Sequence, residues 1–196
     1  RTPQYVNKME NPKYGPEEVD AYKAKFEELK EYLPHSFSGF NFDHTHGSWA
    51  DSTYEERRKV YEEMWDVGSL RFWLATYTEI FYEEEANEEI SEFVKEKMRA
   101  RLKDPDLCEL LIPNDYGFGT HRVPLESNYL EVYHRENVEA VGVKNNPISE
   151  ITTDGIKLTD GTMFDLDVII LATGFDAGTG ALTRIDIRGR NGRSLK

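Results

Sequence analysis

Apolar residues recur at helical spacing over residues 15–104, and this pattern predicts mainly helices there. Gly15-Pro16 places a proline where the first turn of a helix tolerates it. A later helix is expected to start at Thr53, because Glu56 stands three residues further on and completes a capping box. The first helix presents one apolar stripe, formed by Val19, Tyr22, Phe26, Leu29 and Leu33.

The middle of the chain predicts two more helices and two loops. Apolar residues surround much of a helix over Leu70–Phe81, which suggests that this helix is buried. Asn87 is a suitable cap for a further helix, and Asp104-Pro105 is expected to end it. The glycine- and serine-rich segment Ser36–Ser52 predicts an ordered loop with aromatic anchors, near a substrate. Residues 107–119 predict a second loop.

In the second half of the chain the apolar period changes from helical to alternating. Asp154-Gly155 and Asp160-Gly161 are turn signals between alternating segments, which together predict a β-meander. The four apolar residues that begin Val168–Ala172 predict a strand buried on both faces. The remaining elements predicted are a short helix at 127–134 and strands at 138–143, 148–151, 155–159 and 162–164.

Composition narrows the class of protein. The 196 residues are 38% hydrophobic and carry a net charge of −13, which is typical of a globular chain that repels nucleic acid and anionic lipid. Cys108 is the only cysteine, so a reducing, cytoplasmic location is expected, and no segment approaches the ~18 apolar residues of a membrane span. His44 and His46 beside Asp43 are short of the ligands that zinc needs, so we expect solvated loop histidines and no metal.

Arg122 is the leading candidate for chemistry. It follows a glycine-punctuated segment, and its guanidinium offers a planar fork of donors suited to an oxyanion, carboxylate or phosphate. A surface or salt-bridged arginine is the alternative from the residues alone. His121 beside it could act as a general base or contact phosphate. Thr173-Gly174, after the predicted buried strand, stands where open α/β sheets bind cofactors.

Four segments taken in chain order resemble the Baeyer–Villiger monooxygenase family of flavoproteins. They are Arg1–Gln4, Thr120–Pro124, Val168–Asp176 and Gly180–Gly189, and the likeness extends over essentially the whole chain. No initiator methionine is present, and the chain begins within one of these segments. We therefore expect an interior fragment of a longer protein.

The resemblance implies roles for particular residues. Arg122 aligns with the family's active-site arginine, and Arg1 with Thr2 matches the pair that holds the 2′-phosphate of NADPH. His121 stands where the family usually has a lysine that contacts NADPH, so its contact with this cofactor is a departure from the pattern. Three residues at the passage between the two cofactor domains contact cofactor or form a structural hinge: Thr173, Gly174 and Asp176.

The same resemblance implies an α/β fold, α+β within this fragment, belonging to a protein with two dinucleotide-binding domains. A helical insertion is followed by a β-meander and a buried, parallel-type strand. The implied divisions are the end of the NADPH-domain core at 1–14, the helical insertion at 15–106, the return to the NADPH domain at 107–171 and the linker into the FAD domain at 172–196.

The implied activity uses FAD, NADPH and O2 to insert one oxygen atom next to the carbonyl of a small ketone, giving an ester or lactone. Neither phosphate-binding Gly-x-Gly-x-x-Gly loop occurs in these residues, so the partner required is the remainder of the same polypeptide. Two alternatives stay open. One is a flavin monooxygenase that N-hydroxylates amines or oxidises sulfur, and the other is a non-catalytic binding module.

Overall fold

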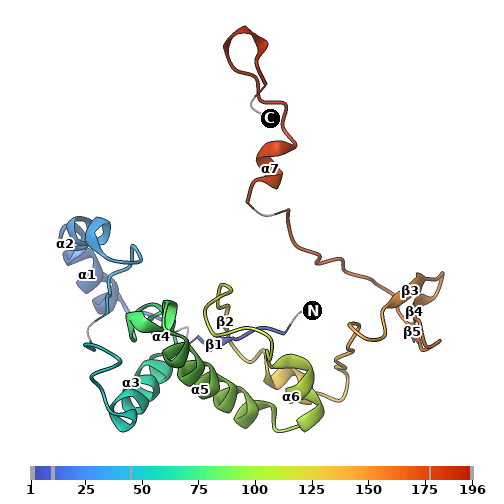
Figure 1. The fold of residues 1–196 in the computed structure, drawn as a ribbon, viewed down its shortest axis with the longest axis horizontal. Coiled ribbons are helices and arrows are strands. Elements are labelled where there is room, and N and C mark those ends of the chain that lie inside the picture. Colours follow the sequence, from blue (N-terminus) through green and yellow to red (C-terminus); the bar gives the residue numbers. More distant parts are fainter. Residues whose placement is uncertain (1–2, 10–11, 45, 177, 195–196) are drawn as a thin grey trace. The chain divides into compact units, whose positions relative to one another are not determined.

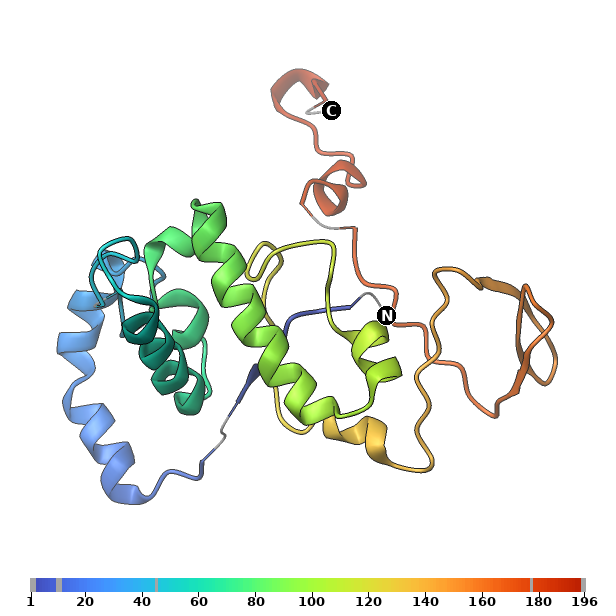
Figure 2. The ribbon, with the colours of Figure 1, turned by 60° about the horizontal axis from the view of Figure 1, so that its bottom comes forward.

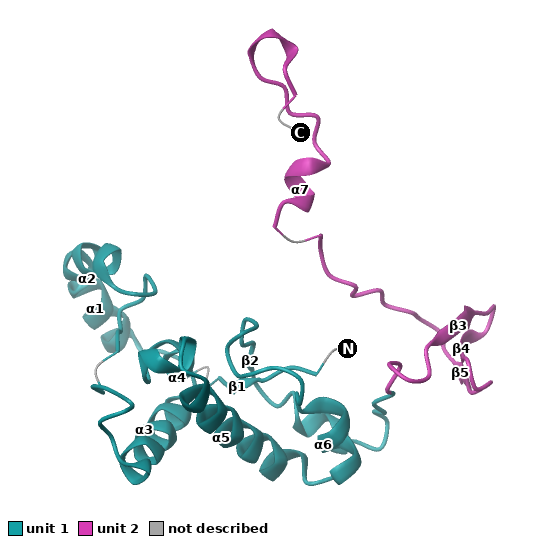
Figure 3. Cartoon of the chain, in the orientation of Figure 1, with its two compact units in different colours: residues 1–141 teal, residues 142–196 magenta. Residues whose placement is uncertain are grey.

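Two compact units make up the chain, Arg1–Val141 and Gly142–Lys196 (Figures 1 and 3). The computed structural model describes residues 3–9, 12–44, 46–176 and 178–194. No helix in these ranges combines the length and the apolar character that crossing a bilayer requires.

The first unit is mainly helical. It contains the strands β1 (Asn7–Lys8) and β2 (Leu125–Glu126) and the 3-10 helices η1 (Leu33–His35), η2 (Thr78–Phe81) and η3 (Glu131–His134). Its α-helices are α1 (Pro16–Ala24), α2 (Phe26–Tyr32), α3 (Tyr54–Val67), α4 (Arg71–Leu74), α5 (Glu84–Leu102) and α6 (Pro105–Leu111).

Helix α5 runs through the middle of this unit and supplies more of its described core than any other helix (Figure 2). Phe93 of α5 stacks on Phe72 of α4 with ring centroids 5.6 Å apart, and Trp65 of α3 meets Phe72 edge-on at 5.2 Å. Such aromatic pairs contribute packing beyond the area that they bury. The other fully buried α5 side chains are Ala86, Ile90, Val94, Met98 and Leu102.

Strands β1 and β2 pair in parallel, with Asn7 opposite Leu125 and Lys8 opposite Glu126. More than a hundred residues of mostly helical chain separate these two short strands in the sequence. The helices are therefore an excursion between two neighbouring parallel strands. This pairing was not predicted, because two residues are too few to show a strand period.

The predicted first helix and capping box correspond to observed helices. The first helix begins at Pro16 but divides into α1 and α2 at Lys25, and neither part buries a residue. Helix α3 begins after Thr53, whose hydroxyl accepts from the Glu56 amide at 3.3 Å while the Glu56 carboxylate accepts from the Thr53 amide at 2.8 Å.

Three predictions for the helical region are wrong. Leu70–Phe81 is not one helix, because the buried residues 75–77 separate α4 from η2 and the Thr76 hydroxyl donates to the Phe72 carbonyl. Asn87 does not cap α5, which begins at Glu84. Helix α5 ends at Leu102, just before Asp104-Pro105 as expected. The loop predicted at 107–119 is partly helical, since the Asp104 carboxylate accepts from two amides of α6 and starts that helix.

The second unit contains a three-stranded antiparallel sheet in the order β3 (Ile148–Ile151), β4 (Gly155–Leu158), β5 (Met163–Asp165). The strands lie where the sequence alternates, on either side of the two Asp-Gly signals. A Cβ on Gly155 would lie 1.8 Å from the Phe164 carbonyl oxygen, so this position requires glycine. The short helices α7 (Gly180–Thr183) and η4 (Arg190–Gly192) follow.

Predictions for the segments around this sheet fare less well. Residues 138–143 form no strand, and only the last four residues of the predicted helix at 127–134 are helical. Val168–Ala172 is neither a strand nor buried, and the Ile170 side chain is 84% exposed. A strand buried on both faces needs neighbouring strands, and no described residues of this unit pair with it.

Replacing Thr53 with alanine should destabilise α3. The substitution removes the acceptor of the Glu56 amide, and loss of such a cap costs about 1 kcal/mol. Thr53→Ser keeps the hydroxyl and should unfold like the parent chain in urea. Equal midpoints for the alanine and serine variants would contradict the role of the cap.

Candidate functional site

Arg122 lies on a segment that is anchored on both sides of it. Its own side chain is exposed and makes no ion pair with another described residue. Val123 next to it is buried in the core, and the Pro124 carbonyl accepts from the Asn7 amide at 3.0 Å where β1 and β2 meet. The backbone of Arg122 is therefore tied to the core while its guanidinium faces outward.

The loop before Arg122 is bound to α5 through both backbone groups of Phe118. The Phe118 amide donates to the Ser91 hydroxyl at 2.8 Å, and the Phe118 carbonyl accepts from the Asn87 side-chain amide at 2.8 Å. Asn87 also donates to the Ile80 carbonyl at 2.8 Å, and its oxygen accepts from the Ser91 hydroxyl at 3.3 Å. Both polar groups of the Phe118 backbone are thus satisfied by side chains one helical turn apart.

Two glycines allow the loop to approach these side chains closely. A Cβ on Gly117 would lie 1.9 Å from the Asn87 side-chain oxygen. Gly119 has a φ of +77°, and a Cβ there would lie 2.4 Å from Nε1 of Trp73. The loop therefore approaches Asn87 and Trp73, two side chains of the same unit.

The beginning of the chain lies against the same loop. The Tyr116 hydroxyl donates to the Pro3 carbonyl at 2.7 Å, and the Tyr5 hydroxyl donates to the Tyr116 carbonyl at 3.1 Å. Burial raises the pKa of Tyr5, so its hydroxyl stays protonated as this donor. The predicted site residues Arg1 and Thr2 lie outside the described residues, but Pro3, which follows them, is beside the loop that leads to Arg122.

His121 is exposed but its ring does not project freely into solvent. It lies over the ring of Tyr116, with centroids 4.3 Å apart and planes tilted by 31°. The predicted neighbours His121 and Arg122 therefore differ in their surroundings. The histidine packs on the aromatic residue that binds the start of the chain, while the arginine is open.

A groove of about 840 Å³ separates part of the loop from α5. Its walls include Tyr5, Asn87, Ser91, Lys95, Tyr116 and Gly119. Lys95 pairs with Glu92 at 2.7 Å, and this contact lowers the pKa of Glu92. The polar contacts to Phe118 are therefore made at the edge of an open space and not within continuous packing.

The strand that follows Arg122 is fixed by a second arginine. Arg101 of α5 pairs with Glu126 of β2 and with Glu131 of η3, the latter at 2.6 Å. The hydrogen bond from Arg101 lowers the pKa of Glu131, and the Glu126 side chain is only 6% exposed. Glu126 also accepts from the Tyr129 amide at 2.7 Å. Sequence reasoning missed this cluster, because 25 to 30 residues separate its members.

The remaining predicted cofactor residues lie in the second unit. Gly174 has a φ of +86°, and a Cβ built there meets no atom within 4 Å. Asp176 pairs with Arg184 at 3.2 Å, and its carboxylate lies where a side chain at Gly180 would be. Thr173 precedes this bend and is exposed. Thr173, Gly174 and Asp176 thus belong to the second unit, whereas Arg122 belongs to the first.

The prediction that the loop histidines are solvated is wrong in part, because His44 and His46 are only half-exposed. Nδ1 of His44 lies 3.4 Å from the Thr76 carbonyl oxygen, and the His44 ring meets the Phe37 ring edge-on at 5.0 Å. Burial lowers the pKa of His46. Aromatic residues on both sides of this loop therefore cover the imidazoles. In the ranges that the structure describes, no three histidine, cysteine or carboxylate side chains could share a metal ion.

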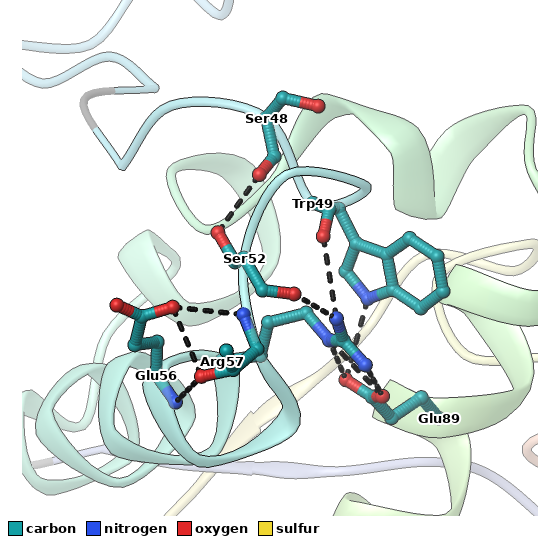
Figure 4. A network of polar contacts seen from close by, with 7 residues as sticks. Ser48, Trp49, Ser52, Glu56, Arg57 and Glu89 are labelled. Carbon is teal, nitrogen blue, oxygen red and sulfur yellow. Dashed lines mark hydrogen bonds and ion pairs between the residues drawn. The ribbon is translucent and has the colours of Figure 1, made fainter.

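A polar network that sequence reasoning did not find fixes the end of this loop (Figure 4). Arg57 of α3 pairs with Glu89 of α5 at 2.6 Å, and both side chains are nearly buried. The Arg57 guanidinium lies 4.2 Å from the Trp49 ring and donates to the carbonyls of Trp49 and Ser52. The Trp49 indole nitrogen also donates to Glu89. The planar guanidinium of Arg57 directs its donors to Glu89, Trp49 and Ser52 at once, so the network joins the end of the loop to both helices.

Comparisons with known proteins show which family this chain is related to. The chain is 65% identical over 195 residues to an acetone monooxygenase (methyl acetate-forming) of a Gordonia species, and 34% identical over 197 residues to a Baeyer–Villiger monooxygenase of Pseudooceanicola batsensis. Each alignment includes 100% of this chain and 36% of the relative. The chain is homologous to a segment of the Baeyer–Villiger monooxygenases. No protein-family model matches it.

Solved structures agree with this family assignment. A crystal structure of OTEMO in complex with FAD and NADP aligns with a TM-score of 0.93 and 38% identity, over 100% of this chain and 36% of that one. A phenazine N-monooxygenase of Lysobacter antibioticus is also similar, at 34% identity over 179 residues, which are 91% of this chain and 33% of the relative. The chain thus spans about a third of the length of these proteins.

Alanine at Gly119 should destabilise the first unit more than alanine at Gly47. Both glycines have left-handed backbones, with φ of +77° and +79°, but only a Cβ at 119 meets Trp73. Gly47→Ala should cost about 1 kcal/mol of strain, and Gly119→Ala about 2–4 kcal/mol because overpacking adds to it. Urea unfolding measures both losses. Equal losses would contradict the close packing of this loop.

Proposed function

We propose that the whole protein to which this chain belongs oxygenates small ketones to esters or lactones, with FAD and NADPH as cofactors. The chain's 65% identity to an acetone monooxygenase supports this function and favours short aliphatic ketones as substrates. The observation that carries the catalytic assignment is the exposed Arg122 on an anchored backbone, without a neutralising carboxylate in the described part of the chain.

Arg122 is the catalytic residue in this proposal. Attack on a ketone carbonyl places negative charge on its oxygen, and a fixed cation nearby stabilises that charge as it develops. The guanidinium remains protonated at any relevant pH and directs two parallel donors to one side. When bound, FAD reduced by NADPH supplies the oxygen-transfer chemistry. The contribution of this chain is to hold the guanidinium in place.

The residues present fit contact with these cofactors at two places. Gly174 has open space beside its Cα, so a ligand can approach this backbone, and Thr173 beside it offers an exposed hydroxyl. Arg1 and Thr2 would hold the 2′-phosphate of NADPH, and Pro3, next to them, lies at the loop of Arg122. His121 would approach NADPH, while Asp176, which already pairs with Arg184, would orient the linker backbone.

The pairing of β1 with β2 supports the proposed domain division. Residues 1–14 and the part of the chain that returns at 107–171 would belong to one NADPH-binding domain, because Asn7–Lys8 and Leu125–Glu126 are direct neighbours in a parallel sheet. Residues 15–106 would be the helical insertion between them. Residues 172–196 would lead into the FAD-binding domain.

Oxygenation of nitrogen is the second candidate function, since one relative is named a phenazine N-monooxygenase. Incubating the full-length protein with NADPH and either acetone or an aromatic amine separates the two functions by the product formed. A non-catalytic binding module is the third. The 196 residues contain neither phosphate loop, so the fragment alone should not retain flavin absorbance on purification, whereas the full-length protein should.

Arg122→Ala in the full-length enzyme should lower ester formation by a factor on the order of 10²–10³ and leave flavin content and melting temperature unchanged. Arg122→Lys should also be poor, since it keeps the charge but loses the fork. Arg99→Ala, at a half-exposed arginine of α5, is the matched control. Wild-type ester formation by Arg122→Ala would refute the assignment.

A further inference from the structure

We propose that Asn87 and Ser91 are positioning residues that hold the Phe118 backbone, and through it Arg122, in the orientation that oxygenation requires. This inference rests on the proposed role of Arg122. It assigns a part in the reaction to two side chains of α5 that belong to the helical excursion and not to the strand segment that carries the arginine.

The chain before Arg122 fixes its own conformation only in part, through bonds from the Thr120 amide and hydroxyl to the Gly117 carbonyl. Gly117 and Gly119 flank Phe118, and glycine has the widest choice of backbone angles. The groove of about 840 Å³ lies along one side of Gly117–Thr120, so packing does not confine the loop from that side. The orientation of this loop relative to the rest of the unit must therefore be set by contacts to other elements.

Asn87 and Ser91 supply those contacts in a form that fixes direction. They bond the amide and the carbonyl of Phe118, which belong to the two peptide groups on either side of its Cα, and so set the orientation of both groups relative to the α5 axis. Their own link at 3.3 Å and the bond from Asn87 to the Ile80 carbonyl restrict the two side chains in turn. An apolar pair would bury the same face of α5 without selecting one orientation.

The buried Phe118 ring and the buried Val123 side chain set the two ends of the short segment that contains Arg122. Phe118 is 1% exposed and meets Tyr5 and Phe72 edge-on at 5.7 Å and 5.4 Å. Val123 is 2% exposed. Only four residues lie between these anchors, so a rotation of the backbone at Phe118 changes the position of the Arg122 guanidinium.

The test compares Ser91→Ala with wild type in the full-length, FAD-loaded enzyme supplied with NADPH and acetone. The readout is the ratio of ester formed to NADPH consumed. Displacement of Arg122 should lower that ratio on the order of tenfold, since misplacement of a reacting group by about 1 Å can cost 10²-fold. Loss of folded enzyme alone would lower both quantities together and leave the ratio unchanged.

Thr76→Val is the matched control. Thr76 is a fully buried residue whose hydroxyl donates to the Phe72 carbonyl at 3.2 Å, so the hydrogen bond it makes is to α4 and not to the backbone of Phe118. This variant should lower the melting temperature without changing the ratio. Ser91→Cys keeps a weak acceptor of similar size and should give an intermediate ratio; it also provides the reading if Ser91→Ala does not fold.

The possible results separate the positioning role from the proposed function. Wild-type ratios for both Ser91 variants, together with lost oxygenation in Arg122→Ala, would overturn the positioning role alone. Wild-type oxygenation by Arg122→Ala would overturn the role of Arg122 and the positioning inference with it. If Thr76→Val lowered the ratio of ester to NADPH as much as Ser91→Ala does, the effect would not be specific to the Phe118 backbone. This result would also overturn the inference.

Discussion

The structure around Arg122 depends on both backbone groups of one residue, Phe118, being bonded by side chains of one helix. Without the contacts of Asn87 and Ser91 to Phe118, the flexible segment Gly117–Thr120 would border an open groove. Its amide and carbonyl would then need other partners, because buried backbone groups are rarely left unpaired. The bond pattern explains why two glycines flank the bulky Phe118, since both must let α5 and Trp73 come close.

The parallel pairing of β1 and β2 joins the two ends of the long helical excursion. The chain leaves β1 and returns on its neighbour β2, so both ends of the helical part are held at one short pairing. Arg101 of α5 extends that link, because it pairs with Glu126 on the returning strand and with Glu131 beyond it. Helix α5 therefore contacts the segment of Arg122 both before and after the arginine. In the proposed enzyme, the helical excursion would be part of the active-site support.

Local signals were readable from the sequence, and signals that depend on distant partners were not. The Thr53 capping box and the strands beside Asp154-Gly155 follow from residues within four positions of one another. Asn87 has the residue type of a cap, but its side chain satisfies two carbonyls from elsewhere in the fold. Arg122 was selected for its neighbours in sequence, whereas the residues that hold its loop carry no local pattern.

The apolar segment Val168–Leu171 shows how burial can be encoded without being realised in the chain at hand. Four successive apolar residues are typical of a strand covered on both faces, yet all four are exposed here. The chain spans about a third of the proteins that it resembles, so most of the surface that could cover this segment belongs to other sequence. The hydrophobic pattern therefore reports the environment in the longer protein. Among the described residues, no strand lies beside this segment to cover it.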